Sequence, residues 1–139
     1  FGKEQEYDKR YIEKIGQGDF ECFIAEKNSK LVSYFIVFNS AINSPLMKTP
    51  INRQKVTEKD AYLSSVFTIP DARGLWIMPY SISHIINYLK EETNQKNVIF
   101  LLHKNTPGAI QFYQKLGFKI LEDVAPKGPI QWLLGKFKI

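Results

Sequence analysis

The 139-residue sequence has a single cysteine, two histidines and no long hydrophobic run. One cysteine, Cys22, excludes an internal disulfide bond and is typical of proteins of the reducing cytosol. With only His84 and His103 beside it, the sequence has no zinc-ligand pattern, so we expect no metal cofactor. No segment approaches the ~20 apolar residues that a membrane span requires, and the first residues lack the pattern of a secretory signal. We therefore expect a cytoplasmic protein that does not contact membranes.

The basic residues are not concentrated in any segment. The net charge is +5, yet no block of Lys and Arg is present, so we do not expect a nucleic-acid partner. A dispersed positive excess fits an anionic small molecule such as a nucleotide-bearing cofactor, or ordinary solubilising charge. The length and the 44% hydrophobic fraction predict one globular domain over residues 1–139. Because the chain begins at Phe1 without an initiator Met, we expect a processed or truncated piece.

Hydrophobic periodicity predicts a mixed α/β (α+β) fold with one central sheet, mainly antiparallel and flanked by helices. We expect strands at residues 20–26, 31–39, 60–69, 98–103, 118–122 and 130–137 and helices at 5–15, 79–92 and 107–116. The first two strands form a hairpin through the turn Lys27–Lys30, and the nearly all-apolar second strand is expected in the centre of the sheet. Pro79 is predicted at the first position of its helix and Gly117 at the end of the last helix. Cys22 is predicted to be a buried, inert thiol.

Residues 40–59 have the composition of a long loop, rich in Asn, Ser, Pro and Lys. So long a loop in a compact domain is expected to be functional or mobile. We expect it near the acceptor side of the sheet. There Lys48, Arg53 and Lys55 would meet an anionic acceptor, or they are merely solvated.

The segment Arg73–Met78 lies between the carboxyl end of a predicted strand and the amino end of a predicted helix. Backbone N–H groups and the positive end of a helix dipole make such a place suited to a phosphate or pyrophosphate. Arg73 would add a charge-assisted hydrogen bond. The alternative is that Arg73 and Gly74 simply form a turn.

The strand before this turn offers backbone groups to a ligand. If its neighbour diverges at Pro70, the N–H and C=O groups of Val66, Phe67 and Thr68 are left without strand partners. An amide-bearing chain such as pantetheine could pair with them as an added strand, and one N–H group could hold an oxyanion.

The helix that follows Asn105 carries Tyr113 on its apolar face. A phenol near a thioester sulfur could protonate a departing thiolate. Alternatively, Tyr113 is a core residue whose hydroxyl is satisfied within the protein.

Three segments resemble the cofactor motifs of the GNAT superfamily of acetyl-CoA-dependent N-acetyltransferases. They are Val66-Phe67-Thr68-Ile69-Pro70, Arg73-Gly74 and Asn105…Ala109…Phe112-Tyr113…Leu116-Gly117-Phe118. The resemblance covers roughly Tyr62 to Ile120 and implies the GNAT-like acyl-CoA N-acyltransferase fold, with its first strand missing or shortened.

The resemblance also implies acetyl-CoA as co-substrate and assigns the contacts with it. Pantetheine contacts are implied at Val66, Phe67 and Thr68. Pyrophosphate contacts are implied at Arg73, Gly74, Leu75, Trp76, Ile77 and Met78. A further cofactor contact is implied at Asn105, with Tyr113 as the general acid.

Trp76 and Met78 depart from the family pattern, which has small residues at both places. Glycine there lets the backbone approach the pyrophosphate without an intervening side chain. The two larger side chains therefore weaken or reshape the predicted phosphate site.

The function implied by the resemblance is transfer of an acetyl group from acetyl-CoA to a primary amine of a small molecule or peptide, by direct attack of the amine. The departures at Trp76 and Met78 keep open a non-catalytic acyl-CoA-binding or regulatory module. An aminoacyl-tRNA-dependent transferase on the same fold would need a more basic surface. A homodimer is left open. We assign no general base, for which the candidates are Glu21, Glu26, Asp60 and His103.

Overall fold

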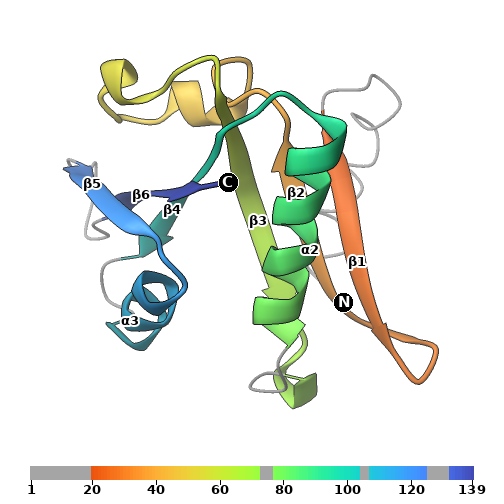
Figure 1. The fold of residues 1–139 in the computed structure, drawn as a ribbon. Helices are drawn as coiled ribbons and strands as arrows, with labels where there is room; N and C mark the ends of the chain where they lie inside the picture. Colours follow the sequence, from red (N-terminus) through yellow and green to blue (C-terminus); the bar gives the residue numbers. More distant parts are fainter. Residues whose placement is uncertain (1–19, 73–76, 104–106, 125–131) are drawn as a thin grey trace.

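The computed structural model describes residues 20–72, 77–103, 107–124 and 132–139. Figure 1 shows that these residues form a sheet with two α-helices on the same side of it. The strands are β1 (Glu21–Lys27), β2 (Lys30–Phe38), β3 (Asp60–Thr68), β4 (Asn97–His103), β5 (Lys119–Val124) and β6 (Trp132–Lys138). The α-helices are α2 (Ile77–Glu92) and α3 (Pro107–Lys115), and the 3-10 helices are η1 (Pro45–Lys48), η2 (Arg53–Lys55) and η3 (Pro70–Ala72). The predicted helix at residues 5–15 lies outside the described residues.

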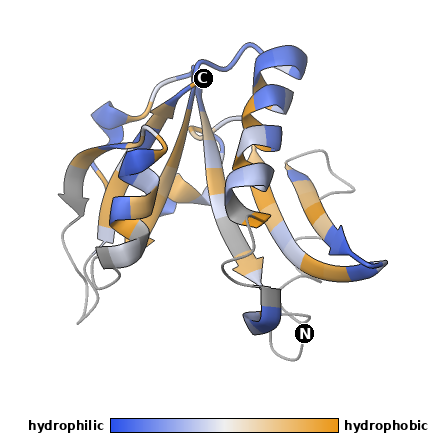
Figure 2. Ribbon diagram, turned by 60° about the horizontal axis from the view of Figure 1, so that its bottom comes forward, coloured by the Kyte–Doolittle hydropathy of each residue, from blue (hydrophilic) through white to orange (hydrophobic). Residues whose placement is uncertain are grey.

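The sheet is mixed and mainly antiparallel, which confirms the predicted fold class. Its six strands follow the order β1-β2-β3-β4-β6-β5, and β3–β4 is the parallel pair within the described residues. The hairpin between β1 and β2 turns through Asn28 and Ser29, which both have positive φ angles (55° and 63°). Asn tolerates this conformation better than most residues. Figure 2 shows that this turn is hydrophilic, whereas the central strands carry mostly hydrophobic residues.

The side chains of strand β2 are buried on both faces of the sheet, as predicted from its apolar sequence. Residues 32–38 are all buried. Because side chains alternate across a strand, Phe35 and Val37 face the cluster under α2 and α3. Tyr34, Ile36 and Phe38 face a second cluster on the opposite side of the sheet.

The segment 40–59 covers this second face. It contains η1 and η2, which are capped by the side chains of Ser44 and Asn52. Leu46 is fully buried in the second cluster, where Ala41, Ile51 and Val56 join it. The segment lies beside the beginning of β3, as its hydrogen bond from the Ala41 N–H to the Asp60 carbonyl shows (2.8 Å). The expected long loop is therefore a packed element, and Figure 1 places it at the other end of the sheet from the start of α2.

Two local predictions are wrong. Helix α2 begins at Ile77, so Pro79 is its third residue. Proline is tolerated there because the first N–H groups of a helix have no intrahelical acceptor. Cys22 is exposed because β1 is an edge strand of the described sheet. Its side chain lies on the opposite face from that of Phe23, which packs on Tyr88 of α2.

Neither of the two described α-helices has the length and hydrophobicity that a membrane-spanning helix requires.

Candidate functional site

The parallel pair β3–β4 is short. Its ladder joins Asp60 to Asn97, Ala61 to Val98 and Tyr62 to Ile99, and it ends there. Strand β3 continues along β2 to Thr68, whereas β4 continues along β6 to His103. Figure 1 shows the two strands diverging toward the end at which α2 begins. The sequence predicted that the strands diverge at Pro70, but the divergence starts earlier, directly after Tyr62.

A β-bulge accompanies this divergence. On β2, Ile36 pairs with Ser65 and the next residue, Val37, pairs with Leu63, so that Ser64 is the extra residue of β3. The Ser64 hydroxyl lies 3.4 Å from the Ile36 carbonyl oxygen. A bulge bends its strand and increases the local twist. This gives β3 a physical reason to leave β4 directly after Tyr62. No signal in the sequence marks the bulge.

The hydrogen bonds of β3 fix which backbone groups face β4. The Ile69 N–H donates to the Val32 carbonyl oxygen (2.9 Å), so the polar groups of Ile69 point toward β2. Backbone polar groups alternate sides along a strand. Those of Phe67 therefore also point toward β2, and those of Val66 and Thr68 point toward the side on which β4 has diverged. Of the three predicted pantetheine residues, the backbone groups of Val66 and Thr68 therefore point away from β2, as the prediction requires. Those of Phe67 do not.

Ser33 holds the end of β3 in this orientation. Its side chain is fully buried. Its hydroxyl donates to the Phe67 carbonyl oxygen (2.6 Å) and shares a hydrogen bond with the Thr68 hydroxyl (2.9 Å). The Phe67 ring stacks on Tyr34 at a centroid distance of 5.7 Å. Sequence reasoning missed Ser33 because its contacts are with residues more than thirty positions away.

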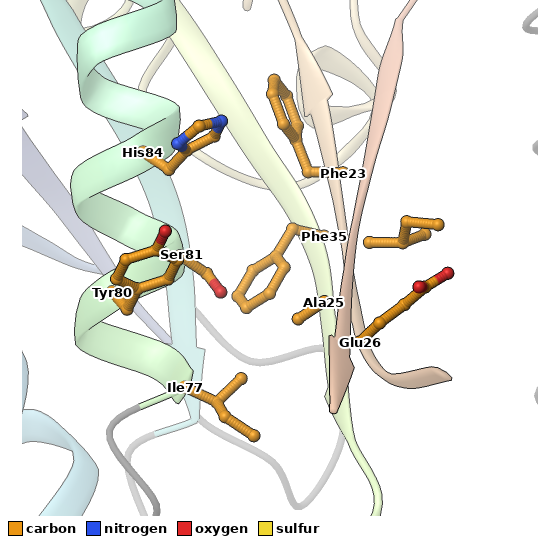
Figure 3. A pocket seen from close by; sticks show the side chains of 9 residues that line it. Phe23, Ala25, Glu26, Phe35, Ile77, Tyr80, Ser81 and His84 are labelled. Atoms are coloured by element: carbon orange, nitrogen blue, oxygen red, sulfur yellow. The ribbon is translucent and has the colours of Figure 1, made fainter. Parts of the chain in front are cut away.

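The predicted pyrophosphate turn is only partly within the described residues. Arg73, Gly74, Leu75, Trp76 and Asn105 lie outside them, and their roles stay predictions. Met78 is described by its backbone alone, within the first turn of α2. Ile77 begins this helix, and its side chain lines a pocket between α2 and β1 (Figure 3).

Tyr113 is set in place by the end of α3. The Phe118 N–H donates to the Tyr113 carbonyl oxygen and the Gly117 N–H to that of Gln114, both at 3.0 Å. With Gly117 at a φ of 105°, this is a Schellman motif. Its usual apolar contact is the edge-on packing of Tyr113 against Phe118, at 5.4 Å between ring centroids. The predicted helix end at Gly117 is thus confirmed.

The Tyr113 side chain is 8% exposed, and its ring also packs on Phe100. Burial raises the pKa of the Tyr113 phenol above its ordinary value, because the phenolate is poorly solvated there. The phenol is therefore protonated at neutral pH, as a hydrogen-bond donor must be. The same burial also fits a core residue, so the structure leaves both interpretations of Tyr113 in place.

The four candidates for a general base lie in different parts of the sheet. Glu21 and Glu26 are exposed on β1. Asp60 is fully buried at the start of β3, where it forms an ion pair with Lys136 (3.2 Å) and accepts hydrogen bonds from the Thr57 N–H and the Asn97 amide.

His103 ends β4, and its ring packs edge-on against Trp132. Asp60 differs from the other candidates in its position, because its ion pair and hydrogen bonds hold it at the paired end of β3 and β4.

Among the described residues, no group of three or more His, Cys, Asp and Glu side chains could hold a metal ion. The absence of a metal cofactor stays a prediction.

The sequence profile of the Acetyltransferase (GNAT) family matches residues 1–118. The chain belongs to this family. Its curated relatives include the probable N-acetyltransferase san of Drosophila melanogaster, which is 24% identical over 115 residues. That match covers 83% of this GNAT chain and 55% of the relative, so the chain spans about half the length of the curated relative.

Solved structures share the fold of this GNAT chain at low sequence identity. The ribosomal-protein-S18-alanine N-acetyltransferase of Escherichia coli aligns at a TM-score of 0.67 and 15% identity, over 91% of this chain and 76% of its own. A chimera of the Vibrio cholerae spermidine N-acetyltransferase SpeG and hSSAT aligns at a TM-score of 0.71 and 14% identity, over 96% and 76%. The predicted GNAT fold is confirmed.

Proposed function

We propose that this GNAT chain carries an acetyl-CoA-dependent N-acetyltransferase activity, which transfers an acetyl group to a primary amine of a small molecule or peptide. The observation that carries the proposal is the end of the β3–β4 ladder at Tyr62 and Ile99. Beyond it, the backbone groups of Val66 and Thr68 point away from β2, toward the side that β4 has left. An extended ligand with amide groups can pair with a strand presented in this way.

The described residues fit such a ligand. Backbone N–H and C=O groups at Val66 and Thr68 would bind the amides of the pantetheine arm, and the first turn of α2 would bind the pyrophosphate. Arg73–Trp76 and Asn105 are proposed to complete the site. Acetyl-CoA, when bound, supplies a thioester carbonyl that is open to attack by an amine.

Two kinds of group in the chain would assist the reaction. Backbone N–H groups of β3 would donate hydrogen bonds to the carbonyl oxygen as negative charge develops on it. The Tyr113 hydroxyl would donate to the departing sulfur. Because burial raises the pKa of the Tyr113 phenol, the phenol stays protonated at neutral pH and has a proton to donate to the sulfur.

The acceptor is proposed only as a class. Two structural neighbours are named for spermidine and for an alanine of a ribosomal protein, which supports proposing both small-molecule and polypeptide amines as acceptors. The net charge of +5 favours acceptors that carry a negative group over polycations. A cytoplasmic location and a homodimer stay predictions of the sequence.

A non-catalytic acyl-CoA-binding module is the second candidate, favoured by Trp76 and Met78 in the phosphate turn. Acetyl-CoA should raise the melting temperature in both cases. The two are separated by measuring thiol release from acetyl-CoA with a panel of polyamines, amino sugars and peptides. Amine-dependent release supports the enzyme. A thermal shift without release from any amine supports the binding module, and no thermal shift removes both.

A further inference from the structure

A pocket of about 350 Å³ lies on the other flank of α2 from the β3–β4 divergence, against β1 and β2. It is lined by Phe23, Ile24, Ala25, Glu26, Phe35, Ile77, Tyr80, Ser81 and His84. Figure 3 shows Phe23, Ala25 and Phe35 pointing toward α2, whereas Glu26 points to the far side of β1. The volume is within the range of roughly 300–1,000 Å³ that small-molecule sites occupy. Of the lining residues, only Ile77 also belongs to the predicted pyrophosphate segment, and the proposed acetyl transfer gives no role to the others.

Ser81 is the informative residue of this pocket. Of the four buried polar residues in the described chain, Ser33, Ser44 and Asp60 all form side-chain hydrogen bonds. The Ser81 side chain is only 8% exposed, and within the described residues its hydroxyl forms none. Figure 3 shows this hydroxyl directed from α2 toward Phe35 and the pocket. Buried polar groups without a partner are rare because their desolvation is uncompensated, so the pocket is suited to a ligand that supplies one.

Most of the remaining lining residues are aromatic or aliphatic, and Glu26 and His84 are the polar exceptions. Phe23 presents its ring beside Tyr88, with which it packs edge-on at 5.2 Å. Tyr80 and His84 stack at an interplanar angle of 20°, and Tyr80 is 74% exposed. An aromatic ligand can pack favourably on such rings in offset-stacked or edge-to-face contact. His84, three residues after Ser81 on the same flank of α2, adds one further polar group at the mouth.

We propose that this pocket binds a small aromatic molecule with one hydrogen-bonding group, whose ring lies among Phe23, Phe35 and Tyr80 and whose polar group meets the Ser81 hydroxyl. Ile82 and Ile85 of α2 are buried in the core cluster that also contains residues of β3 and β4. Because this packed core lies on the β3–β4 side of the helix, we propose that the occupant of the pocket is a different molecule from the acetyl acceptor. The site does not depend on the proposed function.

The test uses p-cresol as the probe and toluene, which lacks only the hydroxyl, as its control. Backbone amide NMR of the full chain follows each titration. We expect saturable shifts confined to β1, the adjoining part of β2 and the first half of α2. Binding of p-cresol should be tighter than that of toluene. Ser81→Ala should weaken p-cresol by about fivefold, the worth of one net hydrogen bond, and leave toluene unchanged.

Two variants and one competitor complete the design. Ser83→Ala removes an exposed hydroxyl from the same helix and should change neither affinity. Ala25→Leu fills the pocket from β1 and should abolish both titrations. Excess coenzyme A should not displace p-cresol.

The proposal is overturned if p-cresol gives no saturable shifts, or if p-cresol and toluene bind alike with and without Ser81. It is also overturned if coenzyme A competes, because the pocket would then be part of the cofactor site. If the protein fails to bind acetyl-CoA but p-cresol binds as expected, the proposed function is wrong and the proposal for this pocket still holds.

Discussion

Tyr62 and Ile99 form the last residue pair of the parallel ladder between β3 and β4. The bulge at Ser64 follows at once on β3, and beyond it the strand alternation directs Val66 and Thr68 toward the side that β4 has left. The proposed cofactor site is thus a consequence of one extra residue in one strand. The predictions below test this account from the bulge outward.

Deletion of Ser64 should abolish binding of acetyl-CoA. Without the extra residue, β3 either slips by one position, which turns Val66 and Thr68 toward β2, or straightens alongside β4. Ser64→Ala keeps the backbone bulge and loses only a long hydrogen bond of 3.4 Å, so its affinity should stay within about threefold of the wild type. Titration calorimetry measures both, with far-UV circular dichroism to check that the deletion variant is folded. Equal binding by both variants would disconnect the bulge from the site.

Tyr113→Phe should slow thiol release from acetyl-CoA by roughly 100-fold, at the low end of general-acid effects, because burial makes the phenol a weaker acid. The affinity for acetyl-CoA should change little. Tyr88→Phe is the matched control, since it removes a hydroxyl that bonds Asn39 on the far side of α2. A Tyr113→Phe variant with wild-type turnover would make Tyr113 a core residue and nothing more.

Stability at alkaline pH should depend on Tyr113. Its folded pKa is raised above the unfolded value near 10, so the neutral phenol contributes stability fully below pH 10. That contribution is lost as the pH rises through the folded pKa, because the unfolded chain releases its proton first. Urea unfolding at pH 9 and pH 11 should therefore show a larger loss for the wild type than for Tyr113→Phe. Equal losses would mean that the phenol is solvated.

The glycine inside α3 and the glycine that follows its end should respond in opposite directions to alanine. Gly117 has a φ of 105°, and an added Cβ would lie 3.0 Å from the Phe137 ring, so Gly117→Ala should cost about 1–3 kcal/mol. It should also displace Tyr113, which the same Schellman motif holds, and slow thiol release. Gly108 is the second residue of α3 with open space around it, and Gly108→Ala should stabilise by up to about 1 kcal/mol. Thermal unfolding compares the two variants.

Much of the fold could be predicted from local signals. The Lys27–Lys30 turn, the apolar β2 and the end of α3 at Gly117 each have short-range causes. These are the φ tolerance of turn residues, burial on two faces, and the C-terminal glycine of a Schellman motif. The family motifs within residues 62–120 added the fold type.

The remaining features depend on partners that are distant in the sequence. The bulge at Ser64 arises from a register shift in the pairing with Ile36 and Val37 of β2. The residues next to Ser64 in the sequence carry no signal for it. Cys22 is exposed because β1 lies at the edge of the described sheet, although its neighbours are those of a buried strand. The segment 40–59 has a loop's composition, yet Leu46 packs on the second face. The alternation that turns Phe67 toward β2 likewise appears only once Ile69 is paired with Val32.

Hydrogen exchange of the full chain with and without saturating acetyl-CoA tests the central claim most directly. If the cofactor lies along the freed half of β3, amide exchange should slow in peptides that contain Leu63–Thr68 and in the first turns of α2, from Ile77 to Ser81. The β1–β2 turn should exchange as before. Unchanged exchange at Leu63–Thr68 while acetyl-CoA is bound would place the cofactor elsewhere and contradict the account.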